Sequence, residues 1–248
     1  LIANHLMTKK ICVPPRVEHI KDAKYEGAYV KEPRIGMQKW VVSFDINSLY
    51  PHIIVQYNIS PEKMLGVNSS GVSVNKMLDK KTPLDHLKTE GATITPNGAM
   101  FKTDSQGFLP EMIQKIYNER VVFKKRMLKA KKEYQKTKEP KLVKEIARCH
   151  NIQWARKIAL NSCYGAIGNQ YFRYYDVAQA SAVTTAGQFI IRFIEEKVNE
   201  YLNQVLQTHG KMDYIVASDT DSIYVSLDKL VEKTCKNKTD DQIADFIG

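Results

Sequence analysis

The sequence predicts a mixed α/β fold, in which helices pack on one face of a sheet and a two-helix arm is inserted into the middle of the chain. Residues 40–45 alternate apolar and polar side chains as a strand does, and residues 214–225 hold two strand-like runs around a short break. Long, lysine-rich segments with helix start and stop signals lie between these two stretches. The expected order is therefore strand, helical arm, long helix and hairpin.

The first predicted strand ends on a carboxylate. Alternation with period 2 puts every second side chain on the same face of a strand. The more apolar face then carries Trp40, Val42 and Phe44. Asp45 ends the strand on the other face, which it shares with Val41 and Ser43. Because Pro51 suits an early helical position, we expect a short helix directly after the acid.

The stretch after this helix has little periodicity of either kind. We expect residues 66–95 to form loops, because their helix and strand signals are weak. The T-P-N-G sequence at residues 95–98 predicts a turn.

The helical arm follows. Residues 107–111 predict a helix start, with a proline and an acid in the first turn, and the helix is expected to run to about Lys136. A break at residues 137–140 separates it from a return helix over about residues 141–161. Two helices of this length form a hairpin roughly 30–38 Å long. A purely structural coiled-coil arm is the alternative, but the apolar positions keep no clean heptad.

The net charge is concentrated in this arm. The chain has 37 Lys+Arg against 27 Asp+Glu, and residues 111–164 contain 15 of the former and 5 of the latter, so this window holds the entire excess of +10. A local positive field suits a polyanionic partner such as nucleic acid. The alternative is an ordinary solvated face.

The cysteines indicate a reducing environment. They are scattered, with no C-x-x-C pair and no secretory segment ahead of them: Cys12, Cys149, Cys163 and Cys235. No apolar run approaches the roughly 20 residues of a membrane span. These features predict a soluble protein of the cytoplasm with buried thiols and no membrane partner.

A long helix is expected to begin near Thr184 or Thr185 and to end at Gly210. Its apolar stripe is predicted to face the core: Phe189, Ile190, Phe193, Ile194, Val198, Tyr201, Leu202, Val205 and Leu206. The helix is followed by the predicted hairpin over residues 214–225.

Two carboxylates stand at the tip of that hairpin. With a period of 2, Asp219 and Asp221 would project to the same side, and two close negative charges cost free energy unless a cation or a shared proton compensates them. A solvated turn is the alternative, since Asp, Thr and Ser are common in turns. Asp45, at the end of another strand, is a third carboxylate, and we expect all three to converge on one cleft.

Such a set of acids suits Mg²⁺, which prefers carboxylate oxygens and often shares its shell with substrate phosphates. Two such ions can support an in-line phosphoryl displacement. Arg120 and Lys124 are four apart on one helix face, and Lys157 projects from the return helix, so a hairpin folded over the acids would bring three cations toward a triphosphate. No P-loop sequence is present.

Three motifs now resemble those of family B (polymerase-α-like) DNA polymerases. S-F-D-I-N-S-L-Y-P at residues 43–51 is similar to their first motif, D-x-x-S-L-Y-P. K-I-A-L-N-S-C-Y-G at residues 157–165 matches their K-x-x-x-N-S-x-Y-G finger motif, and D-T-D-S at residues 219–222 matches their third motif. All three occur in the order of the family, and the resemblance covers essentially the whole chain.

Shorter phrases extend the resemblance. Y-E-G-A at residues 25–28 resembles the template-contacting Y-x-G-G/A element that precedes the palm. N-I-S-P-E at residues 58–62 and R-Y-Y-D at residues 173–176 look most like the replicative polymerases of T-even-type tailed bacteriophages.

The resemblance implies an α/β (α+β) palm with a mainly antiparallel sheet and packed helices, plus an inserted two-helix antiparallel fingers hairpin. The implied domains are a first palm part over residues 1–110, which includes the template-contacting segment, fingers over residues 111–165 and a second palm part over residues 166–248. Exonuclease motifs and a thumb are missing, so the sequence is expected to be a palm and fingers fragment.

The resemblance also implies site residues. Asp45 and Asp221 would bind two Mg²⁺ ions, for which Mn²⁺ can substitute, with help from the backbone carbonyl of Ile46. Asp219 would complete the catalytic set by tuning their geometry. The implied dNTP-binding residues are Ser48, Leu49, Tyr50, Arg120, Lys124, Lys157 and Asn161. Tyr50 would exclude a ribose 2′-hydroxyl. Tyr164 and Gly165 would line the nascent base pair, and Tyr25 and Gly27 would contact the template.

The implied function is that of a template-directed DNA polymerase core, which transfers a nucleotide from a dNTP to a primer 3′-hydroxyl in phage DNA replication, in the host cytoplasm. Its partners would be primer–template DNA and dNTPs, together with a sliding clamp or the missing exonuclease and thumb portions. Ala217-Ser218 replaces the usual Tyr-Gly before the third motif, and His52 replaces a serine. A non-catalytic nucleic-acid-binding fragment, an RNA polymerase and a nucleotide cyclase are the alternatives.

Overall fold

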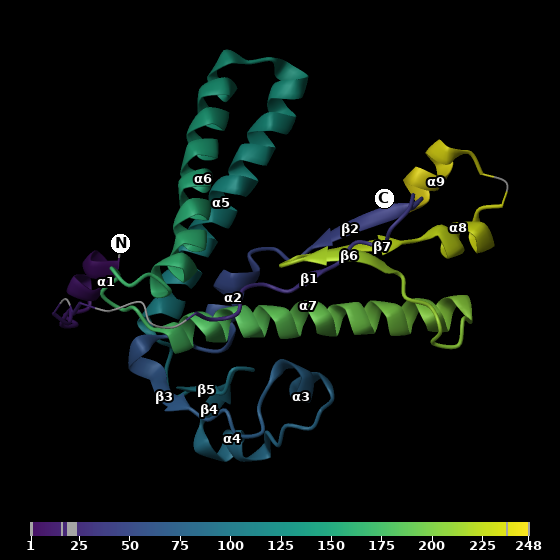
Figure 1. The fold of residues 1–248 in the computed structure, drawn as a ribbon. Helices are drawn as coiled ribbons and strands as arrows, with labels where there is room; N and C mark the ends of the chain where they lie inside the picture. Colours follow the sequence, from purple (N-terminus) through teal and green to yellow (C-terminus); the bar gives the residue numbers. More distant parts are fainter. Residues whose placement is uncertain (1, 16, 19–23, 237, 248) are drawn as a thin grey trace.

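The computed structural model describes residues 2–15, 17–18, 24–236 and 238–247 (Figure 1). The outer limits of the predicted domains, Leu1 and Gly248, lie outside the described residues.

A four-stranded antiparallel sheet brings the two ends of the chain together. Its strand order is β1 (Val30–Lys31), β6 (Ile215–Asp219), β7 (Ser222–Ser226) and β2 (Val41–Asp45). Every neighbouring pair is antiparallel. The predicted mixed fold and the hairpin over residues 214–225 are therefore confirmed, and the sheet joins segments that are more than 170 residues apart.

One long helix covers one face of this sheet. α7 (Val177–Leu206) runs along the sheet in Figure 1, and its Ile191, Leu202 and Leu206 pack with Ile223 of β7. α8 (Asp228–Thr234) and α9 (Asp240–Ile247) follow at the far end. None of the described helices combines the length and the apolarity that a membrane span requires.

α7 differs from its prediction at its start, at its end and in its apolar face. It ends at Leu206, before the predicted end at Gly210, because Gln207 has a left-handed φ of 58°. It begins seven residues before Thr184, because the Asp176 side chain accepts hydrogen bonds from the backbone nitrogens of residues 178 and 179 at 2.8 and 3.1 Å. Three predicted core residues are exposed instead: Phe193, Tyr201 and Val205. The four-stranded sheet is narrow and buries only a strip of the helix, so the apolar stripe is wider than the surface that it covers.

The predicted strand over residues 40–45 is confirmed over Val41–Asp45. Trp40 has a left-handed φ of 49° and precedes the strand, and it packs against the α8–α9 segment. Phe44 is 54% exposed although it lies on the predicted more apolar face of the strand. β2 is an edge strand, so its side chains have neighbours on one side only.

The helical arm is an antiparallel hairpin that projects from the rest of the molecule (Figure 1). It consists of α5 (Phe108–Thr137) and α6 (Pro140–Ile167), so the return helix runs six residues beyond the predicted end at Asn161. Ion pairs join the two helices, from Arg126 to Glu145 at 2.5 Å and from Arg156 to Glu119 at 2.7 Å. The predicted turn between the helices is confirmed.

Residues 66–95 are not all loop, as we expected. A second sheet contains β3 (Met64–Val67), β5 (Ala99–Lys102) and β4 (Ala92–Ile94), in this order. α3 (Val74–Leu78) and α4 (Asp85–Glu90) lie beside it. Elements of three to six residues are too short to show a period, so the sequence did not reveal them.

The predicted turn over residues 95–98 is confirmed, since the Gly98 nitrogen donates to the Thr95 oxygen at 2.8 Å. Gly98 has φ +87°, and a Cβ there would lie 2.4 Å from the Asn68 backbone oxygen. This position therefore requires glycine both for its backbone conformation and for the close approach of another strand.

The base of the arm is fixed by three side chains of the N-I-S-P-E phrase. The first backbone nitrogens of the α5 region donate to them: Gly107 to Asn58 at 2.8 Å, Phe108 to Glu62 at 2.7 Å and Leu109 to Ser60 at 3.4 Å. These nitrogens have no partner within the helix, so the phrase caps α5 from a distant segment.

Asn58 does more than cap this helix. It is buried, and its Nδ2 also donates to the backbone oxygens of Lys102 at 2.7 Å and Ser105 at 2.9 Å. Its φ of 57° is one that asparagine tolerates better than most residues. Asn58 thus fixes the segment that leads into the arm.

We expect Asn58→Ala to lower the free energy of unfolding by about 2–3 kcal/mol, because three hydrogen bonds are lost and buried backbone groups are left unpaired. Urea unfolding followed by circular dichroism measures the change. Asn151→Ala, at an exposed position of α6, is the matched control and should not destabilise the protein. An equal effect of both substitutions would contradict the role given to Asn58.

Candidate active site

Two of the predicted acids lie in one row across the sheet. Asp45 of β2 is paired with Ser222 of β7, and Ser222 is paired with Asp219 of β6. Residues directly opposite each other project on the same face, and neighbouring strands are about 4.8 Å apart. The Cα atoms of Asp45 and Asp219 are therefore about 10 Å apart, on the face that α7 does not cover.

Asp221 lies in the turn between these strands. Its backbone oxygen accepts a hydrogen bond from the Ile46 nitrogen at 2.8 Å, and the Thr220 nitrogen donates to the Tyr29 oxygen at 3.1 Å. Thr220 has a left-handed φ of 56°, so Asp219 and Asp221 are related by a turn and the period-2 argument for them is wrong. The convergence of all three acids, however, is observed.

The acids form a region of concentrated negative charge. Burial raises the pKa of Asp221, the negative charges of Asp45 and Asp219 raise it further, and the positive charge of Lys157 opposes them. Among the described residues, no Lys, Arg or His lies within ion-pair distance of any of the three carboxylates. The charge is thus left for a cation that is not part of the chain.

Hard oxygen ligands of this kind suit a divalent cation. Asp45 and Asp221 could supply carboxylate oxygens. The hydrogen bond from the Ile46 nitrogen to the Asp221 backbone oxygen brings the residue after Asp45 next to Asp221. In the described part of the chain, no group of three or more His, Cys, Asp or Glu is arranged so that it could hold a metal ion by itself. A Mg²⁺ ion here would therefore need oxygens from water or a substrate as well, which is usual for this ion.

A cavity of about 240 Å³ opens beside Asp221. It is lined by Ser48, Leu49, Tyr50, Pro51, Asn161, Thr220 and Asp221. Four of the predicted dNTP-binding residues thus share one cavity with a catalytic candidate. Leu49 is only 4% exposed, so most of its side chain belongs to the core.

Arg120 reaches this cavity from the arm. Its Nη1 donates to the Ser48 Oγ at 3.2 Å, and its Nε is buried with no hydrogen-bond partner among the described residues. An unpaired buried donor is costly, so this guanidinium is suited to an anionic partner.

Three tyrosines connect the cavity with the Y-E-G-A segment. The rings of Tyr50 and Tyr164 meet edge to face with centroids 4.8 Å apart, and the hydroxyls of Tyr164 and Tyr25 are 3.4 Å apart. Burial, and then the hydrogen bond with Tyr25, raises the pKa of Tyr164, so this hydroxyl stays protonated. Predicted base-pair, template and sugar-contacting residues therefore form one packed row.

Two glycines that the sequence did not single out make room for this row. A Cβ at Gly187 of α7 would lie 3.0 Å from the Tyr50 ring, and a Cβ at Gly168 would overlap the Tyr25 hydroxyl. Nothing in the local sequence marks these positions, because the reason for glycine is a side chain from a distant segment.

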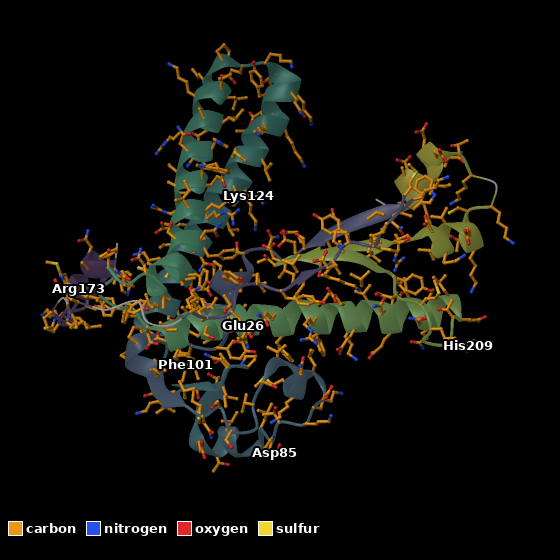
Figure 2. The ribbon with its side chains drawn as sticks, in the orientation of Figure 1. Glu26, Asp85, Phe101, Lys124, Arg173 and His209 are labelled. Atoms are coloured by element: carbon orange, nitrogen blue, oxygen red, sulfur yellow. The ribbon has the colours of Figure 1, made fainter. Side chains whose placement is uncertain are left out.

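The remaining predicted residues lie at the edge of the site. Lys124 is exposed on α5 and does not line the cavity (Figure 2). Lys157 is exposed on α6, and its positive charge is near enough to Asp221 to lower the pKa of that carboxyl. Gly165 and Gly27 are exposed, and a Cβ at either would meet nothing within 4 Å of it, so neither is required by packing within the chain.

Ala217 and Ser218, which replace the usual Tyr-Gly before the third motif, point to opposite faces of the sheet. Ala217 is paired with Tyr224 on the open face, whereas Ser218 is paired with the buried Ile223 and is itself buried against α7. His52 packs its ring on Tyr117 at the edge of the arm, away from the acids.

Comparison with known proteins agrees with the motifs. The family described as DNA polymerase family B matches residues 1–244. The chain belongs to DNA polymerase family B. It is 35% identical to the DNA-directed DNA polymerase of Escherichia phage RB69 over 96% of this chain and 30% of that protein. It is 32% identical to the DNA-directed DNA polymerase of Enterobacteria phage T4 over 94% of this chain and 30% of that protein.

Cellular relatives match as well. DNA polymerase 1 of Pyrococcus abyssi (strain GE5 / Orsay) is 31% identical over 86% of this chain and 23% of its own length. The predicted resemblance to family B, and within it to T-even-type phage polymerases, is confirmed. This family B chain spans about 30% of the length of the phage relatives that it matches.

The raised pKa of Asp221 leads to a testable prediction about thermal stability. The folded-state pKa of Asp221 lies above its unfolded value, so the ionised carboxylate opposes folding at pH 7 when no metal is present. As the pH falls through the raised pKa toward about 4, the folded state takes up the proton and this cost disappears. We expect Asp221→Asn to raise Tm at pH 7 in EDTA by about 1–3 °C, and the gain to vanish near pH 4.

Thermal unfolding across this pH range measures the gain. Asp240→Asn, at an exposed carboxylate in the first turn of α9, is the control and should give no such gain. A lower Tm for Asp221→Asn at pH 7 in EDTA would show that the carboxylate is not under electrostatic strain.

Proposed function

We propose that this chain forms the palm and fingers of a template-directed DNA polymerase. The observation that carries the proposal is the convergence of Asp45 and Asp221, with no cationic partner in the described chain, beside a cavity that the fingers arginine reaches. Membership of DNA polymerase family B supports the class of reaction.

The domains follow from this assignment. Residues 1–110 and 166–248 are the two parts of the palm, and residues 111–165 are the fingers. The strand order supports this division, because one sheet combines β1 and β2 from the first palm part with β6 and β7 from the second. The α5–α6 hairpin is the insertion between them.

The reaction is the attack of a primer 3′-hydroxyl on the α-phosphate of a dNTP, with pyrophosphate as the leaving group. Two Mg²⁺ ions, when bound, supply charge neutralisation for the attacking and leaving oxygens. Asp45, Asp221 and the Ile46 carbonyl hold them, and Asp219 shapes the turn that carries Asp221. Mn²⁺, another hard cation, can take the same ligands.

The cavity beside Asp221 receives the dNTP. Arg120 and Lys157 bind its phosphates from the arm, with Lys124 contributing from one turn further along α5. Ser48, Leu49 and Asn161 line the triphosphate and sugar. The Tyr50 ring packs closely against Gly187 and meets the Tyr164 ring edge to face. In this position it leaves no room for a 2′-hydroxyl.

DNA binds along the open sheet face and the base of the arm. Tyr164 and Gly165 contact the nascent base pair, and Tyr25 and Gly27 contact the template. The exposed glycines allow the pair to approach the backbone closely. Exonuclease and thumb portions, or a sliding clamp, supply the proofreading and duplex grip that these residues do not.

One alternative has an observation in its favour. The concentration of Lys and Arg in residues 111–164 would also suit a nucleic-acid-binding module without catalysis. Metal dependence separates the two functions, because phosphate binding by lysines needs no divalent cation whereas the acid cluster does.

We expect the chain to bind Mn²⁺ through the acid cluster, and Asp221→Asn and Asp45→Ala to weaken this binding at least about tenfold, because each removes a charged oxygen ligand. Electron paramagnetic resonance of free Mn²⁺ measures the affinity. Asp240→Asn should leave it unchanged. Metal-independent DNA binding together with unaltered Mn²⁺ affinity in both variants would favour the non-catalytic module.

Sugar selection gives a second test. In a chimera that carries this chain in place of the matching segment of the RB69 phage polymerase, we expect Tyr50→Ala to reduce the preference for dNTP over rNTP by roughly 10–100-fold, because the ring that blocks the 2′-hydroxyl is gone. Primer extension with each nucleotide measures the ratio. Tyr50→Phe, which keeps the ring, is the control. An unchanged ratio in Tyr50→Ala would show that Tyr50 does not exclude the ribose 2′-hydroxyl.

A further inference from the structure

We propose that Trp154 is a positioning residue for the phosphate-binding Lys157, whose ammonium group it holds over its indole ring beside the catalytic acids. The Lys157 Nζ lies 5.2 Å from the centroid of the Trp154 ring. This inference rests on the proposed function, because it assigns Lys157 a triphosphate to bind.

The placement of both residues on α6 supports this role. Trp154 is three residues before Lys157, so the two side chains are neighbours on one helix face. Asn161, one turn further on, lines the cavity beside Asp221. Lys157 is also near enough to Asp221 to lower its pKa, although no ion pair forms. The ammonium group therefore lies over an aromatic ring and within electrostatic range of Asp221.

The exposure of Trp154 is unusual for its size. Trp154 is 49% exposed, and its ring also stacks with His150, with ring centroids 6.1 Å apart and an interplanar angle of 17°. Large apolar side chains are usually buried, and one held at the surface commonly has a contact to make. For Trp154 this contact is with the Lys157 ammonium group.

Several arginines of the arm have polar partners. Arg156 pairs with Glu119, Arg126 pairs with Glu145, and Arg120 donates to Ser48. Within the described residues, Lys157 has no carboxylate within ion-pair distance. The indole ring is thus the contact that the described residues show for the Lys157 ammonium group.

An indole suits this position better than a carboxylate would. A carboxylate would neutralise the ammonium and add negative charge next to Asp221, whereas the ring quadrupole attracts the cation without adding net charge. The ring also restricts a flexible side chain before the phosphates arrive, which lowers the entropy lost on binding. Lys157 therefore remains available to an anionic ligand and is kept from pairing with the acids.

Nuclear magnetic resonance tests the contact without any ligand. Protons above an indole ring are shifted upfield, so we expect upfield ε-methylene resonances for Lys157 in this chain. Trp154→Leu should return them to the usual lysine position, and Trp154→Phe should leave a smaller shift. Unshifted ε-methylene resonances in the unsubstituted chain would overturn the proposal.

A double-mutant cycle tests the role. With Mg²⁺ present, we expect Trp154→Leu to weaken dATP binding by about two- to fivefold, as fits a partly exposed cation–π contact. The same substitution in a Lys157→Met background should have no further effect, which a general packing defect would not produce. Isothermal titration calorimetry measures each affinity.

The chain offers a matched control at the far end of the arm. Lys138 lies over the Tyr134 ring at 5.5 Å, far from the cavity, so Tyr134→Leu removes the same kind of contact and should leave dATP affinity unchanged. Equal losses from Trp154→Leu with and without Lys157 would overturn the inference and leave the proposed function intact. No dATP binding by the unsubstituted chain would overturn the proposed function itself.

Discussion

Like-charge repulsion among three carboxylates is the constraint on which this structure depends. Asp45 and Asp219 lie in one row across the sheet, and Asp221 occupies the turn that joins β6 to β7. Main-chain hydrogen bonds hold that turn on both sides, from Ile46 to Asp221 and from Thr220 to Tyr29. The backbone therefore keeps together charges that would separate on their own, and the resulting free energy is available to a bound cation.

The remaining parts of the site are arranged around this turn. α7 covers the back of the sheet and presents Gly187 to the Tyr50 ring, which lines the same cavity as Asp221. Tyr164 and Tyr25 extend the same packed row toward the Y-E-G-A segment. A substrate that entered the cavity would thus meet a rigid aromatic wall opposite the carboxylates.

The arm supplies positive charge from a separate element with its own attachment. Asn58, Ser60 and Glu62 cap the start of α5, which fixes the base of the arm to the body. Along the arm, acids within the hairpin pair some of the arginines, while Lys157 rests on Trp154. Ion pairs of Arg126 and Arg156 therefore stabilise the hairpin, while Lys157 stays free of any ion pair within the described residues.

The sequence alone determined the features that local patterns encode. The hairpin with its aspartates, the strand ending at Asp45 and the two helices of the arm are each visible within a window of about ten to thirty residues, because side-chain alternation, proline and glycine act locally. The motifs also predicted the family, which the comparisons show.

Only the tertiary structure decided which side chains meet across long stretches of chain. The sheet between residues 64 and 102 escaped the sequence because its strands are too short for a period, and Phe193, Tyr201 and Val205 are exposed because the sheet is narrower than the apolar face of α7. The need for glycine at 187, and the contacts of Asn58, depend on partners 40 to 140 residues away. Such contacts arise from packing in three dimensions, for which a local pattern carries no signal.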